Sequence, residues 1–146
     1  MLREHEDAYG RELLAHYHGE HSFEIVERDD GYFDVSGGPE VYFAPYEAWP
    51  EHQQSAIQLA KGRVLDAGCG AGRVCLHLQE QGLHVLGIDI SPLALEVCRL
   101  RGVKNLKLAS IADVSPQLGS FDTIVLFGNN FGLLAGFEEG RRILKN

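Results

Sequence analysis

A glycine-rich turn between a short apolar run and a helical pattern is the feature that most constrains how this chain folds. Residues 64–67 read Val-Leu-Asp-Ala and residues 68–72 read Gly-Cys-Gly-Ala-Gly, and apolar residues then recur at helical spacing. Glycine lets the backbone bend sharply at such a turn and lets a ligand approach with no Cβ in the way. The pattern predicts a strand, a tight turn and a helix, with the turn at the ligand-binding end of a sheet.

The second part of the chain alternates strand and helix patterns. Ser91-Pro92 is an N-cap followed by proline at the first helical position, and the helix patterns stop at Gly82 and Gly102. Strands separated by helices of about ten residues predict an α/β fold, with a doubly wound, Rossmann-like, mostly parallel sheet. We expect strands at 64–67, 83–89, 105–108 and 121–127 and helices at 73–81, 92–101 and 137–144. The last strand is nearly all apolar, which predicts that both of its faces are covered.

The first part of the chain differs in pattern. Residues 9–18 have helical spacing, and two strand-like runs at 23–28 and 32–35 flank Asp29-Asp30-Gly31, which is typical of a tight hairpin. Pro50 suits an early position in a further helix. We therefore divide the chain into an extension at 1–60, containing a helix, a hairpin and a helix, and an α/β core at 61–146.

Composition narrows the class of protein. The chain has 146 residues, 21 acidic and 13 basic, giving a net charge of −8, and its length suits about one domain. Basic residues do not cluster, which argues against nucleic acid as a partner. No apolar run reaches the roughly 18 residues that a membrane span needs, and no signal peptide is readable at the polar N-terminus. The expectation is a soluble, cytoplasmic protein with no membrane partner.

Candidate metal ligands are sparse. The three cysteines, at positions 69, 75 and 98, contain no Cys-x-x-Cys pair, so we expect reduced, semi-buried thiols. His16 and His18 are two residues apart, a spacing that does not share one face of a helix. No metal site is expected.

A carboxylate at the end of the second strand complements the glycine turn. Asp89 ends residues 83–89, where it can accept two hydrogen bonds from the vicinal hydroxyls of a ribose. Together the turn and Asp89 predict a nucleoside-binding crevice. The glycine spacing is not that of dinucleotide-binding proteins, because their third glycine would fall at position 73, where this chain has Arg73. No Walker motif for a nucleoside triphosphate is present.

These motifs carry a family resemblance. The run from Val64 to Arg73, followed by Gly87-Ile88-Asp89-Ile90-Ser91, resembles the first two motifs of class I S-adenosylmethionine-dependent methyltransferases. Residues 121–125 resemble the fourth-strand motif of that family, so the resemblance covers about residues 60–146. It implies an enzyme that uses S-adenosylmethionine, releases S-adenosylhomocysteine and methylates an acceptor, which residues 127–132 suggest is a small molecule. The alternative is a non-catalytic nucleoside-binding or regulatory domain.

The resemblance also implies which residues bind the cofactor. The glycine turn lies under the methionine part, Asp89 holds the ribose, and residues after the fourth strand line the methyl-transfer face. Ile111 is expected to pack on the adenine, and either Ser110 or Asp113 reaches its polar edge. No catalytic residue is assigned. The predicted cofactor-binding residues are Asp66, Gly68, Cys69, Gly70, Gly72, Asp89, Ile90, Ser110, Ile111, Gly128, Asn129 and Asn130.

Two further expectations concern the ends of the fold. Members of the family continue past the fourth strand with a fifth strand and an antiparallel pair, whereas this chain stops at Asn146. The sequence therefore predicts a fragment whose sheet is incomplete at the C-terminal side. An exposed edge at 121–127 would invite another chain, as in a homodimer. In the extension, Tyr42, Tyr46 and Trp49 are equally consistent with an aromatic lid and with core packing.

Overall fold

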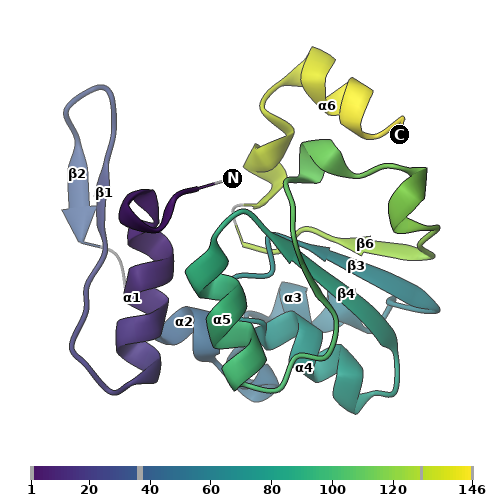
Figure 1. The fold of residues 1–146 in the computed structure, drawn as a ribbon, viewed down its shortest axis with the longest axis horizontal. Helices are drawn as coiled ribbons and strands as arrows, with labels where there is room; N and C mark the ends of the chain where they lie inside the picture. The colour runs from purple at the N-terminus through teal and green to yellow at the C-terminus, as the bar shows by residue number, and fades with distance from the viewer. Residues whose placement is uncertain (1, 36–37, 129, 146) are drawn as a thin grey trace.

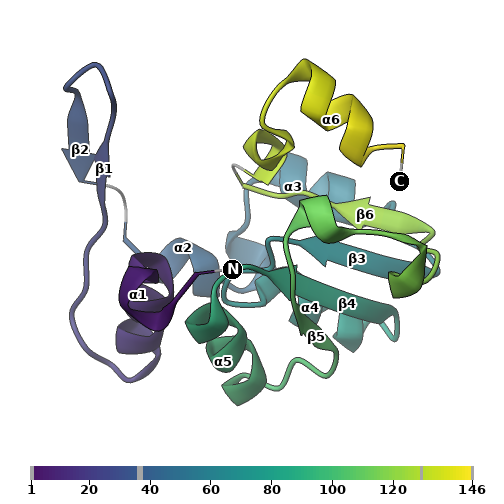
Figure 2. The same ribbon diagram turned by 45° about the horizontal axis from the view of Figure 1, so that its top comes forward.

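The central element is a parallel sheet of four strands in the order β5-β4-β3-β6; Figure 1 shows β4, β3 and β6 side by side, and Figure 2 labels all four strands. The computed structural model describes residues 2–35, 38–128 and 130–145. The strands are β3 (Arg63–Ala67), β4 (His84–Asp89), β5 (Leu106–Leu108) and β6 (Thr123–Val125). Because β4 and β5 lie to one side of β3 and β6 lies to the other, the strand order reverses at β3. The predicted α/β, Rossmann-like parallel sheet is confirmed, and its ligand crevice is expected beyond the carboxyl end of β3.

Helices connect and cover the strands as the sequence predicted. Ser91 caps its helix by accepting the Ala94 N–H at 2.9 Å, and Gly72 precedes the first crossover helix with φ +81°. The helices of this part are α4 (Arg73–Glu80), α5 (Pro92–Leu100) and α6 (Phe137–Ile143), with short 3₁₀ helices at Ile111–Asp113, Pro116–Leu118 and Asn130–Leu134. Figure 2 shows α4 and α5 on one side of the sheet and α6 on the other.

Alternation along the strands divides the core into two layers. Val64 and Val85 pack with α3 (Glu51–Ile57), α4 and α5. The next residues along each strand, Leu65 and Leu86, belong to a separate cluster on the opposite face. This period of two is what a pleated strand imposes on its side chains. Both faces of the two central strands are therefore covered.

The fourth strand departs from its prediction. The sequence indicates seven residues, 121–127, but β6 spans only Thr123–Val125, paired with Val64–Asp66 of β3. Ile124 is 52% exposed, so the expectation of a strand covered on both faces is wrong. The physical reason is position: β6 pairs with β3 alone among the described residues, and Phe127 turns away to pack against Trp49.

The N-terminal part contains the predicted helix and hairpin, followed by two α-helices where the sequence indicated one. Its elements are a 3₁₀ helix at Glu4–Glu6, α1 (Ala8–Tyr17), β1 (Ile25–Glu27), β2 (Phe33–Val35), α2 (Glu40–Phe43), a 3₁₀ helix at Tyr46–Ala48, and α3 (Glu51–Ile57). The hairpin pairs Ile25 with Val35 across Gly31, whose φ is +83°. In both views it projects away from the body beyond α1 (Figures 1 and 2). In the described ranges no helix is long and apolar enough to cross a bilayer.

One buried carboxylate joins the first helix to the sheet. Asp7 caps α1 by accepting the Gly10 N–H at 2.9 Å, and it also accepts the Ser91 hydroxyl at 2.7 Å and the Leu93 N–H at 3.1 Å. Leu13 of α1 is fully buried in a cluster with α5. Since Asp7 serves the N-termini of both α1 and α5, it fixes the extension beside the loop that follows β4.

Candidate functional site

A cavity of about 620 Å³ opens beyond the carboxyl ends of the strands. We call the residues contributed by β3, β4, β5 and the loops after them the floor, and those contributed by residues 1–60 the cap. Residues after β6 complete the wall. The floor comprises Asp66, Gly68, Cys69, Gly70, Ala71, Asp89, Ile90, Ala109, Ser110 and Ile111, and the cap comprises Tyr9, Val41, Tyr42, Ala44, Ala48, Pro50 and Gln53.

The glycine turn forms the middle of the floor. Gly68 and Cys69 donate their N–H groups to the Ile88 carbonyl at 2.9 and 3.0 Å, which ties the turn to the end of β4. Gly70 has φ +53°, and a Cβ there would lie 2.6 Å from the Tyr9 hydroxyl. A side chain at this position would therefore meet the cap, and glycine leaves the backbone open to a ligand.

Gly72 faces a different neighbourhood. It lies outside the cavity lining, and a Cβ on it would lie 2.8 Å from Val103 and 2.9 Å from the Cys98 sulfur. Its φ of +81° is in the left-handed region that glycine tolerates. The structure therefore gives Gly72 a packing position at the start of α4 rather than one on the cavity surface.

Asp89 lies beside the turn, as the sequence predicted. Its Oδ2 accepts the Gly70 N–H at 2.9 Å and its Oδ1 accepts the Ser91 N–H at 3.0 Å. The side chain is 8% exposed, and burial raises its pKa above the usual range of an aspartate. Because each carboxylate oxygen has two lone pairs, each can accept one further hydrogen bond from a ligand in the cavity.

Asp66 lies deeper than Asp89. It is 2% exposed and accepts a hydrogen bond from the Cys75 thiol at 3.2 Å. Burial raises the pKa of Asp66 to about 7, partly offset by that hydrogen bond. This acid therefore sits at the base of the floor, where its own charge is disfavoured by the lack of solvent.

The three cysteines gather beneath the turn. All three are free thiols, as the sequence predicted; Cys75 and Cys98 are fully buried, and Cys69 retains a small exposed surface. The Cys98 thiol donates to the Gly70 carbonyl at 3.0 Å, and the Cys69 and Cys98 sulfurs are 4.0 Å apart. Only Cys69 lines the cavity among these three. The other two support the turn from below.

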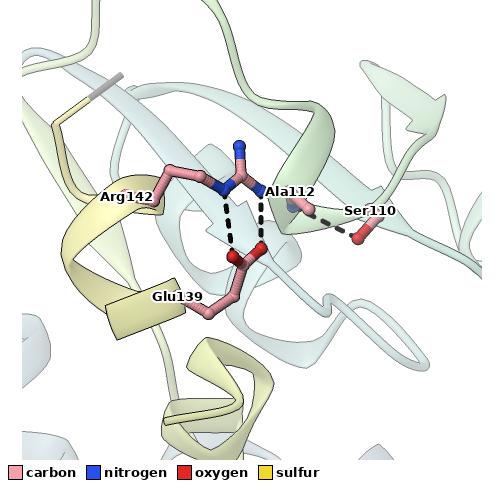
Figure 3. A network of polar contacts seen from close by, with 4 residues as sticks. All are labelled: Ser110, Ala112, Glu139 and Arg142. Atoms are coloured by element: carbon pink, nitrogen blue, oxygen red, sulfur yellow. Dashed lines mark hydrogen bonds and ion pairs between the residues drawn. The ribbon is translucent and has the colours of Figure 1, made fainter. Parts of the chain in front are cut away.

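The region after β5 distinguishes Ser110 from Asp113. Ser110 and Ile111 line the cavity, whereas Asp113 does not. The Ser110 hydroxyl accepts the Ala112 N–H at 3.2 Å, as Figure 3 shows, and the Ser110 N–H donates to the Asp113 carboxylate at 2.9 Å. This reciprocal capping box directs the Asp113 carboxylate back to the chain. Ile90, also predicted, lines the cavity and is 39% exposed.

The wall after β6 contains two of the three residues predicted there. Gly128 and Asn130 line the cavity, and Asn129 lies outside the described residues. The Asn130 amide donates to the carbonyls of Ala67 and Gly68 at 3.0 and 2.7 Å. Asn130 thus holds the wall against the glycine turn.

Sequence reasoning missed most of the cap. Tyr9 packs edge-on against Tyr42, with ring centroids 5.2 Å apart, and burial raises the pKa of the Tyr9 phenol. Of the aromatic residues for which the sequence allowed either a lid or core packing, Tyr42 lines the cavity, whereas Trp49 is 3% exposed and packs in the core. Arg73, immediately after the turn, also lines the cavity, and its place in the motif was the available signal. Among the described residues no cluster of three potential ligands could hold a metal ion.

Comparison with known proteins decides the family. A family model described as a methyltransferase domain matches residues 64–146, more than half of the chain. The chain belongs to this methyltransferase family. The resemblance to S-adenosylmethionine-dependent methyltransferases predicted from the sequence is therefore confirmed, and the matched residues include the whole floor of the cavity.

Relatives of this methyltransferase domain support the assignment. A ubiquinone biosynthesis O-methyltransferase of Xanthomonas euvesicatoria is 30% identical over 64% of this chain and 41% of its own length. A magnesium-protoporphyrin O-methyltransferase of Rhodobacter capsulatus is 38% identical over 43% of this chain and 30% of its own length. The chain thus spans less than half the length of these curated relatives.

A solved structure matches almost the entire chain. It is the S-adenosylmethionine-dependent methyltransferase of Bacteroides fragilis in complex with S-adenosylhomocysteine, with a TM-score of 0.88 and 30% identity. The match covers 99% of this chain and 61% of the other. The similarity therefore extends to residues 1–60 as well as to the α/β core.

Proposed function

We propose that this domain binds S-adenosylmethionine in the cavity and takes part in methyl transfer to a small molecule. The observation that carries the proposal is the hydrogen bond from the Gly70 N–H to the Asp89 carboxylate, which fixes an acid beside an open glycine turn. The bound S-adenosylhomocysteine of the Bacteroides fragilis relative supports the same cofactor here. The curated relatives are O-methyltransferases, which supports oxygen as the acceptor atom.

Different floor residues bind different parts of the cofactor. Asp89 accepts the ribose hydroxyls with the lone pairs that Gly70 and Ser91 leave free. Ile111 packs on the adenine, and Ser110 reaches its polar edge, because Ser110 lines the cavity and the Asp113 carboxylate is engaged in the capping box. Gly68 and Gly70 allow close approach of the remainder of the molecule along the turn.

The chain's own contribution to the chemistry is binding, orientation and exclusion of water. S-adenosylmethionine supplies an activated methyl group on a sulfonium, so the protein mainly aligns the acceptor with the methyl–sulfur bond. Asn130 braces the glycine turn, and Tyr9 and Tyr42 close the cavity from the cap side. Residues 1–60 act as the cap of the site and residues 61–146 as its cofactor-binding core.

A second proposal concerns assembly. Strand β6 is an edge of the sheet within the described residues, and its Ile124 side chain is 52% exposed. Such an edge favours pairing with a further strand, from a second copy or from a longer chain. Light scattering over a dilution series tests pairing between copies, because a monomer at all concentrations contradicts it.

Calorimetric titration with S-adenosylhomocysteine, with NAD as the control ligand, tests the proposed function. We expect saturable binding of S-adenosylhomocysteine and none of NAD. Asp89→Ala should lower the affinity by about 5- to 150-fold, since about 1–3 kcal/mol accompanies the loss of such a partner. Absence of binding by folded wild-type protein contradicts the proposal. Unchanged affinity of Asp89→Ala contradicts the ribose assignment.

A further inference from the structure

Arg73 is the only basic side chain among the described residues that line the cavity. It begins α4, directly after the glycine turn, and is half-buried. The ion pairs of the described residues join Arg3 to Glu6, Arg28 to Asp30 and Arg142 to Glu139. Arg73 therefore contributes a positive charge to the cavity without a carboxylate in contact with it.

Neutral groups hold this guanidinium in place. Its Nη2 donates to the Gln53 side-chain oxygen at 2.7 Å, and its central carbon lies 4.8 Å from the centroid of the Trp49 ring. Trp49 is itself buried, so the stack is rigid. Burial lowers the pKa of Arg73, and the buried Asp66, which is not ion-paired with it, offsets part of that effect through its charge. A half-buried charge of this kind is expected to have an anionic partner when the site is filled.

The layout of the cavity indicates which anion. Asp89, Ile90 and Ser110 follow β4 and β5, whereas Arg73 and Phe127 lie with β3 and β6. S-adenosylmethionine is a linear molecule with a nucleoside at one end and an amino acid at the other. With the ribose at Asp89 and the adenine at Ile111, its amino-acid end extends along the glycine turn toward Arg73.

We propose that Arg73, steadied by Gln53 and Trp49, binds the carboxylate of the amino-acid end of the cofactor. The inference rests on the proposed function. A guanidinium presents five N–H donors in a planar fork that matches a carboxylate, and Gln53 engages only Nη2. The remaining donors suffice for a two-point contact. Lysine would keep the charge but lose the fork and much of the stack on Trp49.

The test compares two ligands that differ in one group. Calorimetry is carried out with S-adenosylhomocysteine and with its decarboxylated analogue, in which hydrogen replaces the carboxylate and a 3-aminopropylthio group remains on the adenosine. Arg73→Gln is expected to weaken binding of S-adenosylhomocysteine about 10–100-fold, the scale of a charge-assisted contact, and to leave binding of the analogue within about twofold. Arg73→Lys is expected to give an intermediate loss.

Arg63→Gln is the matched control. Arg63 also lies over an aromatic ring, that of Phe121, and donates to a backbone carbonyl, but it begins β3 at the opposite end of the strand from the cavity. The Arg63→Gln variant is expected to bind both ligands with the affinity of the wild type. Thermal unfolding of each variant confirms that the comparison is made on folded protein.

Three outcomes overturn the inference. If Arg73→Gln loses the same affinity for both ligands, Arg73 supports the shape of the cavity and does not bind the carboxylate. Unchanged binding of S-adenosylhomocysteine by Arg73→Gln would show that Arg73 does not bind the cofactor carboxylate. A carboxylate of the methyl acceptor would then be the candidate partner of Arg73. Failure of the wild type to bind either ligand contradicts the proposed function itself, which separates the two failures.

Discussion

The floor and the cap of the cavity are built by different means. The floor is made largely of backbone: the turn at Gly68 and Gly70 hydrogen-bonds to Ile88 and to the Asp89 carboxylate. The cap is made of side chains, chiefly Tyr9, Tyr42 and Gln53. Contacts between residues far apart in the sequence, such as the hydrogen bond from the Ser91 hydroxyl to Asp7, hold the cap in position. The proposed cofactor-binding groups of the floor therefore come from a short sequence motif. Covering of the cavity by the cap depends on contacts between residues far apart in the sequence.

Removing the anchor of the cap is the largest expected perturbation. Asp7→Ala leaves the N–H groups of Gly10 and Leu93 and the Ser91 hydroxyl without their buried acceptor, and we expect a loss of about 3 kcal/mol in the free energy of unfolding. Urea denaturation measures the loss, and hydrogen exchange should show faster exchange in α1 than in β3. Asp122→Ala is the control, because this exposed carboxylate also accepts a backbone N–H. A loss no larger than that of the control contradicts the anchoring role.

The buried acid of the floor predicts a pH dependence of stability. The pKa of Asp66 is raised to about 7 in the folded protein, above its value in the unfolded chain, so the folded state binds the proton more tightly. Its contribution is fully present below about pH 4 and is lost as pH rises through about 7. We expect the free energy of unfolding to fall by about 2 kcal/mol from this group between pH 5 and 7.

Urea denaturation at several pH values measures that trend. Asp66→Asn, which cannot ionise, should flatten the profile over this interval while keeping a polar side chain of similar size. A profile for the variant as steep as that of the wild type would assign the dependence to another group, since burial also raises the pKa of Asp89.

Contact between the floor and the cap can be tested by a clash and its rescue. Gly70→Ala places a Cβ 2.6 Å from the Tyr9 hydroxyl and puts alanine at φ +53°, a conformation that costs about 1–2 kcal/mol. We expect weaker S-adenosylhomocysteine binding and lower stability. Adding Tyr9→Phe removes the hydroxyl and should restore part of both losses. No recovery in the double variant would show that backbone strain alone is responsible.

A pair outside both regions provides the smallest effect. Arg142 and Glu139 of α6 share two hydrogen bonds on the surface, shown in Figure 3. Because exposed ion pairs contribute little, Glu139→Gln should leave the melting temperature and ligand binding unchanged within error. A measurable loss of binding would extend the site to α6.

The difference between the floor, built from local motifs, and the cap, built from long-range contacts, explains how much could be predicted from the sequence. The crossover helices and three strands follow from apolar periodicity and helix caps, such as Ser91, and Asp89 was placed by its position at a strand end. Strand β6 was over-extended because the apolar run 121–127 does not reveal that Phe127 leaves the sheet for Trp49. Ser110 and Asp113 were indistinguishable until the capping box showed which one faces the cavity.

The cap could not be predicted for a physical reason. Tyr9 and Gly70 are 61 positions apart, and their approach depends on the packing of α1 against α5 and on the Asp7–Ser91 hydrogen bond. No periodicity or local motif encodes such a contact. Arg73 was visible beside the glycine turn, but its partners Gln53 and Trp49 come from α3 and the segment before it.

A crystal structure of the protein with S-adenosylhomocysteine tests the central claim most directly. The account predicts the ribose hydroxyls within hydrogen-bonding distance of the Asp89 carboxylate, the adenine on Ile111 and the amino-acid end along the glycine turn toward Arg73. A ligand bound outside the cavity, or bound with its ribose away from Asp89, would contradict the assignment of the floor as the cofactor site.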